Sequence, residues 1–74
     1  MSGKVSIVIE KDEHGYYAYS PELPGCQTQA ASVDQAVERM REAIELYLET
    51  LSEEERRSYI SKEIMTTTIE VRVA

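Results

Sequence analysis

The sequence has few groups with which to cross-link itself. It contains one cysteine and one histidine among 74 residues. A single thiol cannot form an internal disulfide, and no cysteine–histidine cluster offers a metal site. A domain this short buries only about 60% of the surface that its unfolded chain exposes, so it usually needs a staple, a metal or a partner. We therefore expect a homodimer, a homotetramer or an obligate complex, with no cofactor or metal.

The sequence also lacks long apolar runs and an excess of positive charge. No run approaches the roughly 20 apolar residues that a membrane-spanning helix needs, and residues 1–4 show no signal-peptide pattern. With a free thiol as well, we expect a cytoplasmic protein and no membrane partner. The net charge is −6. This charge repels phosphate backbones, which argues against direct nucleic-acid binding and favours a basic protein partner.

Short segments of alternating or β-favouring residues predict four strands. The predicted strands cover residues 4–10, 16–20, 26–30 and 65–74. Gly15 follows the first strand and can adopt the positive φ of a four-residue hairpin loop. In the last strand Ile69, Val71 and Val73 share one face.

Two capping boxes predict two helices. Ser32 is followed by Gln35, and Ser52 by Glu55, so each pair can satisfy helix-start donors reciprocally. After Ser32 an apolar stripe continues for about five turns. Its members are Val33, Ala36, Val37, Met40, Ala43, Ile44, Tyr47, Leu48 and Leu51. The second helix should cover roughly residues 53–60.

The expected element order is β-β-β-α-(α)-β, a two-layer α+β domain. The first three strands can form an antiparallel meander, with one long helix on one face. The last strand arrives by a helical crossover, which allows it to lie parallel to a meander strand. The opposite sheet face stays poorly covered. Candidate oligomer contacts are therefore Val8, Tyr17 and Tyr19 on that face, with Leu46, which lies off the helix stripe.

Two prolines stiffen the connection between the second and third strands. Pro24-Gly25 fits the centre of a type II turn, because proline presets φ and glycine accepts a positive φ. Residues before proline are held extended, which fixes the direction of Leu23. One interpretation is a corner that only sets the angle between strands. The other is a rigid lip that presents Glu22 and Leu23 to a partner.

The reactive side chains do not form a catalytic pattern. His14 lies in the hairpin loop, where converging partners are seldom supplied, so a solvated turn is the simpler interpretation. Cys26 lacks an activating base, which favours a small buried or edge thiol. The tyrosines can stack on bases or pack in an oligomer, and the acidic charge favours packing. We expect no catalytic residues and no enzymatic activity.

The exposed side of the long helix is acidic. Asp34, Glu38, Glu42, Glu45 and Glu49 recur at helical spacing. Like charges four residues apart cost about 0.2–0.5 kcal/mol per pair, which a lysine would have relieved. The stripe is either a solubilising face or a surface that meets a basic protein. In the second case Glu38, Glu42, Glu45 and Glu49 contact the partner.

Three segments together resemble the HicB-like antitoxins. They are GYYAYSPELPGCQTQ (15–29), SVDQA (32–36) and REAIELYL (41–48). The resemblance implies a partial RNase H-like fold with the final strand beside the first. The first strand of RNase H-like enzymes carries a metal-binding carboxylate at its centre, whereas this one has Ser6-Ile7-Val8 there, so no metal cluster is expected.

The resemblance also implies a function. Proteins of this family bind and occlude a small basic RNA-cleaving toxin of the HicA type, where one is encoded nearby. Residues 1–74 then form a single HicB-like domain, without the C-terminal DNA-binding segment that many relatives add. The alternative is an oligomeric structural or regulatory interaction module that has no toxin.

Overall fold

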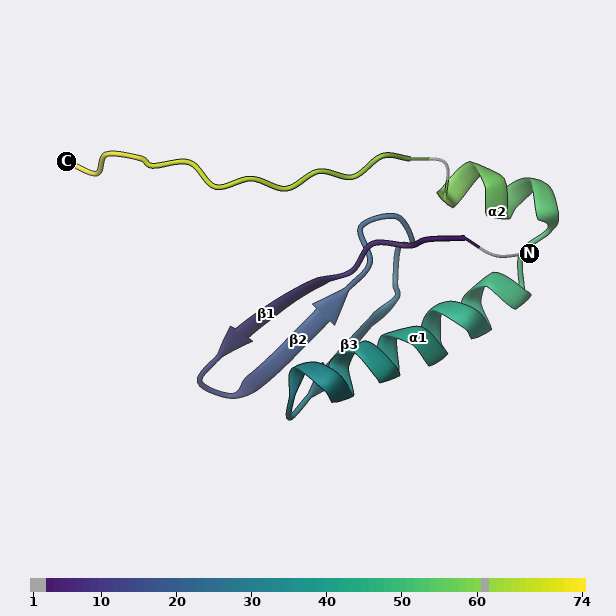
Figure 1. Cartoon of the computed structure of the whole chain (residues 1–74), viewed down its shortest axis with the longest axis horizontal. Coiled ribbons are helices and arrows are strands. Elements are labelled where there is room, and N and C mark those ends of the chain that lie inside the picture. Colours follow the sequence, from purple (N-terminus) through teal and green to yellow (C-terminus); the bar gives the residue numbers. More distant parts are fainter. Residues whose placement is uncertain (1–2, 61) are drawn as a thin grey trace.

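A computed structural model describes residues 3–60 and 62–74, which form an α+β domain (Figure 1). Its elements are β1 (Val8–Asp12), β2 (Gly15–Tyr19), β3 (Gln27–Ala30), α1 (Val33–Glu49) and α2 (Glu53–Ile60). Within the described residues the sheet has the order β1-β2-β3, with both pairs antiparallel. The predicted meander and the two predicted helices are confirmed.

The β1–β2 hairpin is tighter than predicted. Its register runs from Val8 opposite Tyr19 to Asp12 opposite Gly15, so only residues 13–14 form the turn. Gly15 has a φ of 130°, and a Cβ there would lie 3.1 Å from the carbonyl oxygen of Ala30. Glycine is required on both counts. Residues 4–7, predicted as strand, are outside the ladder.

The proline corner is a type II turn, as predicted. Gly25 has a φ of 89°, and the Cys26 N–H donates to the Leu23 carbonyl over 3.1 Å. These are the glycine position and the closing hydrogen bond of that turn type. The Ser20 N–H also donates to the Cys26 carbonyl at 3.1 Å. The corner is therefore tied to both strands that it connects.

The apolar stripe of α1 provides half of the buried core residues. Ser32 caps the helix by accepting the Gln35 N–H at 3.1 Å, while the Gln35 side chain accepts the Ala31 N–H. α1 packs against β3 and β2. The core cluster comprises Ala18, Leu23, Cys26, Ala36, Met40 and Ile44.

α2 is held by its cap and by contacts at its surface, since none of its residues is buried. Ser52 and Glu55 form the predicted capping box, with bonds of 3.1 and 3.0 Å. The Arg56 Nε donates to the Leu48 carbonyl at 2.7 Å. The rings of Tyr47 and Tyr59 meet edge to face, 6.3 Å apart. These contacts fix α2 against the end of α1.

The predicted fourth strand does not form. Residues 62–74, called the tail below, run as an extended trace clear of the sheet (Figure 1). Ile69, Val71 and Val73 are 75%, 72% and 89% exposed. A strand needs a hydrogen-bonded neighbour, and residues 62–74 have none among the described residues. The partial RNase H-like arrangement, with the last strand beside the first, is thus absent from the described residues.

Candidate partner-binding surfaces

The acidic residues of α1 form one continuous exposed surface. At 100° per residue, the five carboxylates from Asp34 to Glu49 fall within roughly 80° of the helix circumference. All five are exposed. The core side chains Ala36, Met40 and Ile44 occupy the opposite side of the helix. We call the surface of Asp34, Glu38, Glu42, Glu45 and Glu49 the acidic stripe.

The acidic stripe is largely unneutralised. Glu38 is 3.9 Å from Arg41, and both side chains are well exposed. Glu42, Glu45 and Glu49 have no ion pair with any residue that the structure describes. An exposed pair of this kind contributes little to stability. The carboxylates are therefore free to meet cationic groups of another molecule.

The sheet face that α1 leaves open carries a small aromatic cluster. Val8 is opposite Tyr19, and Tyr17 lies two residues from Tyr19, so all three share this face. The Tyr17 and Tyr19 rings are 5.8 Å apart, and the Tyr17 hydroxyl donates to Gln27 at 2.8 Å. The structure thus brings together three of the four predicted oligomer contacts. Leu46, 65% exposed, lies on α1 in the other layer.

The corner does not present Glu22 and Leu23 to a partner, so that interpretation is wrong. Leu23 is fully buried in the core, and Glu22 is 3% exposed. The Glu22 Oε1 accepts the Ser6 N–H at 2.7 Å. The rigid turn fixes both side chains, but it turns them inward, where Leu23 packs and Glu22 satisfies the backbone before β1.

A groove lies between α1 and the segment that leads into β1, and we call it the groove beside β1. It has a volume of about 620 Å³ between residues 3–7 and α1. Its apolar lining includes Val5, Ile7, Val37, Ile44 and Leu48. Sequence reasoning did not find this groove. Two features of the sequence could have indicated it. One helix can cover only about two strands of a sheet, and the apolar alternation of the first segment begins well before β1.

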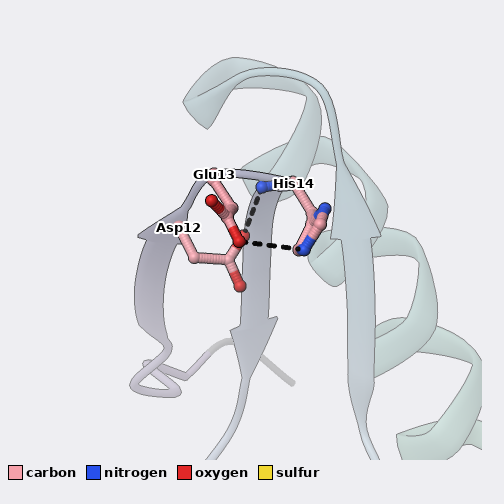
Figure 2. Close-up of polar contacts among 3 residues, drawn as sticks. All are labelled: Asp12, Glu13 and His14. Atoms are coloured by element: carbon pink, nitrogen blue, oxygen red, sulfur yellow. Dashed lines mark hydrogen bonds and ion pairs between the residues drawn. The ribbon is translucent and has the colours of Figure 1, made fainter.

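The hairpin turn has local contacts only. Figure 2 shows Asp12, Glu13 and His14, in which the His14 N–H donates to Asp12 Oδ1 at 2.8 Å and His14 Nε2 lies 3.5 Å from Glu13 Oε1. The His14 and Glu13 side chains are both highly exposed. These contacts shape a solvated turn, as the sequence predicted, and they leave the imidazole without a catalytic partner in the described residues.

Cys26 is the buried thiol that the sequence predicted. Burial raises the pKa of the Cys26 thiol, so less of it is thiolate at neutral pH.

No described group of three or more acidic, histidine or cysteine side chains gathers as a metal site would require. Among the described residues, no helix has the length and apolar character to cross a bilayer.

The described residues thus form a small acidic α+β domain whose exposed surfaces suit contacts with other proteins. The chain belongs to the HicB-like antitoxins of bacterial toxin–antitoxin systems, whose family model matches residues 5–71.

Curated relatives from distant organisms match most of the chain. A UPF0150 protein of Archaeoglobus fulgidus is 52% identical over 63 residues, which is 84% of this chain and 91% of the relative. A UPF0150 protein of Helicobacter pylori is 41% identical over 70 residues, covering 95% and 97%. One of Thermoplasma acidophilum is 45% identical over 49 residues, covering 65% and 71%. No solved structure matches the chain significantly.

Proposed function

We propose that this protein is the antitoxin of a HicA-type pair and neutralises a small basic RNA-cleaving toxin by binding it in the cytoplasm. Family membership supports an antitoxin role. The observation that carries the proposed mechanism is the acidic stripe, where carboxylates gather on one side of a rigid helix. The protein acts by occlusion and performs no chemistry of its own.

The stripe would compete with RNA for the toxin's basic surface. An RNA-binding protein neutralises phosphates with lysine and arginine. Glu42, Glu45 and Glu49 repeat along about two helical turns and supply carboxylates in place of phosphates. Charged surfaces of opposite sign also accelerate encounter, and this acceleration falls steeply with salt. Binding should therefore weaken as ionic strength rises.

The test is a charge-matched comparison. The triple variant E42K/E45K/E49K reverses the stripe, whereas E13K/E54K/E63K makes the same change in net charge at exposed positions outside it. Each is co-expressed with the product of the adjacent reading frame, which the proposal requires to be a small basic protein, and co-purification and growth rescue are measured. We expect the stripe variant to lose both, and the control to keep them.

Equal behaviour of the two triple variants at low salt would remove the stripe from the mechanism. If wild-type protein neither co-purifies with the neighbouring protein nor rescues growth, the antitoxin proposal itself fails. The protein would then act as an oligomeric structural or regulatory module without a toxin. The cluster of Val8, Tyr17 and Tyr19 supports a self-association role of that kind, because partly exposed aromatic residues are favoured at interfaces.

A further inference from the structure

We propose that the tail of one copy of this chain binds the groove beside β1 of a second copy, and that the exchange is reciprocal. The tail becomes the fourth strand of its partner's sheet. This interaction surface meets the acidic stripe only at Glu45, which borders the groove, and the proposal does not depend on a toxin. It rests on two complementary features that the structure leaves unsatisfied, an apolar extended segment and an apolar groove at a strand edge.

The tail has the pattern of a strand with one buried face. Ile69, Val71 and Val73 alternate with Thr68, Glu70 and Arg72, so a paired tail would direct its apolar side chains to one side. In the structure the three apolar side chains are exposed to solvent. β-branched residues in alternation favour strand over coil. The segment lacks only a hydrogen-bonding neighbour.

The groove has the shape and polarity that such a strand needs. β1 pairs with β2 on one side, and no described strand pairs with its other edge. Ser6, two residues before β1, donates its N–H towards Glu22 on the β2 side. By the alternation of a strand, the N–H groups of Ile7 and Ile9 then point to the free edge.

The groove floor suits the tail's apolar face. Val5, Ile7, Val37 and Leu48 line the space under this edge. A strand placed there with Ile69, Val71 and Val73 turned towards α1 covers them. Lys4, Arg41 and Glu45 also border the groove, so its charged rim has one more cation than anion. This excess of positive charge is favourable where two chains that each carry a net charge of −6 meet.

The geometry of α2 favours a second copy over the tail's own groove. Arg56 and Tyr59 fix α2 on α1, and a Cβ built on Gly3 would lie 3.2 Å from Ile60 Cδ1. Ile60, the last residue of α2, thus lies beside Gly3 on a docked helix. Residues 62–74 run as an extended trace clear of the sheet (Figure 1). In strand addition, an extended segment of one molecule pairs with the exposed sheet edge of another. Each copy of this chain carries both an exposed edge on β1 and an extended segment, the tail.

The experiment uses one substitution on each side of the proposed contact. Val71→Asp places a charge on the tail's apolar face, and Thr68→Asp is its control on the other face. Val37→Glu places a charge on the groove floor, and Val33→Glu is its control on the same helix outside the groove. Light scattering after gel filtration should give wild type twice the chain mass of 8.4 kDa. V71D and V37E should weaken dimerisation at least about tenfold, and the controls should not.

Mixing the two defective variants identifies exchange. V71D keeps an intact groove and V37E keeps an intact tail, so an equimolar mixture should recover a dimer that neither variant forms alone. A tail docked in its own groove cannot be rescued in this way. Circular dichroism checks that each variant is folded. Hydrogen exchange on unmodified protein gives an independent measurement, in which amides 66–73 should lose protection on dilution.

Three outcomes overturn the proposal. The first is a wild-type monomer at all concentrations, whatever the protection of its tail amides. The second is a dimer that V71D and V37E leave intact but that substitutions at Tyr17 and Tyr19 dissociate, which assigns self-association to the open sheet face. The third is a mixture of V71D and V37E that stays monomeric although both variants are folded.

Discussion

α1 and the tail carry equally regular apolar patterns, but they have opposite fates. On α1 the repeat places Ala36, Met40 and Ile44 in the core. In the tail the repeat leaves Ile69, Val71 and Val73 in solvent. The helix satisfies its backbone hydrogen bonds internally, whereas a strand depends on a neighbour. A local pattern therefore predicts a conformation, but only the helix's conformation is self-sufficient.

The same contrast separates the protein's two kinds of surface. The acidic stripe is displayed on a helix that the core holds rigid, so its carboxylates are in place before any partner arrives. In the proposed exchange the tail gains hydrogen-bonding partners only when a second copy binds. Pre-organised contacts lose less conformational entropy on association than contacts that must be ordered. We therefore expect the stripe to determine partner recognition and the tail to determine assembly.

The largest expected effect comes from the methionines of these two regions. Met40 is fully buried on α1, and Met65 is 84% exposed in the tail. Met40→Ala should lower the free energy of unfolding by about 2–5 kcal/mol, because it removes buried atoms and leaves a cavity. Met65→Ala should change it by less than about 0.5 kcal/mol. Urea denaturation monitored by circular dichroism measures both.

The methionine pair also tests whether the domain depends on self-association. If Met65→Ala is as destabilising as Met40→Ala, the tail belongs to the folded core, and the contrast between the regions disappears. The measurement should be made at two protein concentrations, since a linked dimer becomes more stable as concentration rises. The Met40 effect should exceed the Met65 effect at both concentrations.

An intermediate effect is expected at the corner. Glu22→Ala removes the acceptor of the Ser6 N–H, and a buried donor left without a partner costs about 1–3 kcal/mol. Glu22→Gln keeps an amide oxygen at that place and should cost less. Glu10→Ala, at an exposed position on β1, is the control and should be nearly neutral. Thermal unfolding of the three variants gives the ranking.

One result would contradict a stabilising role for the Glu22 hydrogen bond. If Glu22→Ala is as stable as wild type, the burial of this carboxylate costs as much as its hydrogen bond gains. The corner would then be held by Leu23 and the Pro24-Gly25 turn without help from Glu22.

The sequence was sufficient where a feature depends on neighbouring residues. The caps at Ser32 with Gln35 and at Ser52 with Glu55, and the turn at Pro24 with Gly25, are each complete within five residues, and all three were predicted; the Gln35 side chain accepts from the Ala31 N–H, one residue before the cap. The three meander strands were located to within a few residues, apart from the late start of β1, whereas the strand predicted over residues 65–74 does not form. β1 starts at Val8 because Val8 pairs with Tyr19, the last residue of β2. The length of the hairpin turn sets this register.

The sequence was insufficient where a feature depends on distant segments. The inward direction of Glu22 depends on the passage of Ser6 beside the corner, 16 residues away. The tail's lack of a partner depends on its position relative to β1, which lies at least 50 residues earlier in the sequence. The groove depends on α1 lying over β2 and β3 and leaving β1 uncovered. Each is a tertiary relation between segments whose own patterns were interpreted correctly.

The smallest effect is expected at α2. It is intermediate between α1 and the tail, because it is a capped helix but has no buried residue. Its core contacts are few, so its capping box contributes a larger share of its stability. Hydrogen bonds from the Ser52 backbone and side chain lower the pKa of the Glu55 carboxyl in the folded protein. A lowered folded pKa means that Glu55 stabilises α2 above the carboxyl's unfolded pKa, and that this stabilisation is lost as pH falls through the folded value.

NMR titration should show the Glu55 carboxyl titrating below its ordinary range, with the Ser52 amide shift following it. Glu55→Gln keeps an acceptor but cannot titrate, so its Ser52 amide should not respond in that pH window. A Glu55 midpoint at or above the ordinary value would show that the cap does not distinguish the charged form, and that α2 depends on Arg56 and Tyr59 for its position.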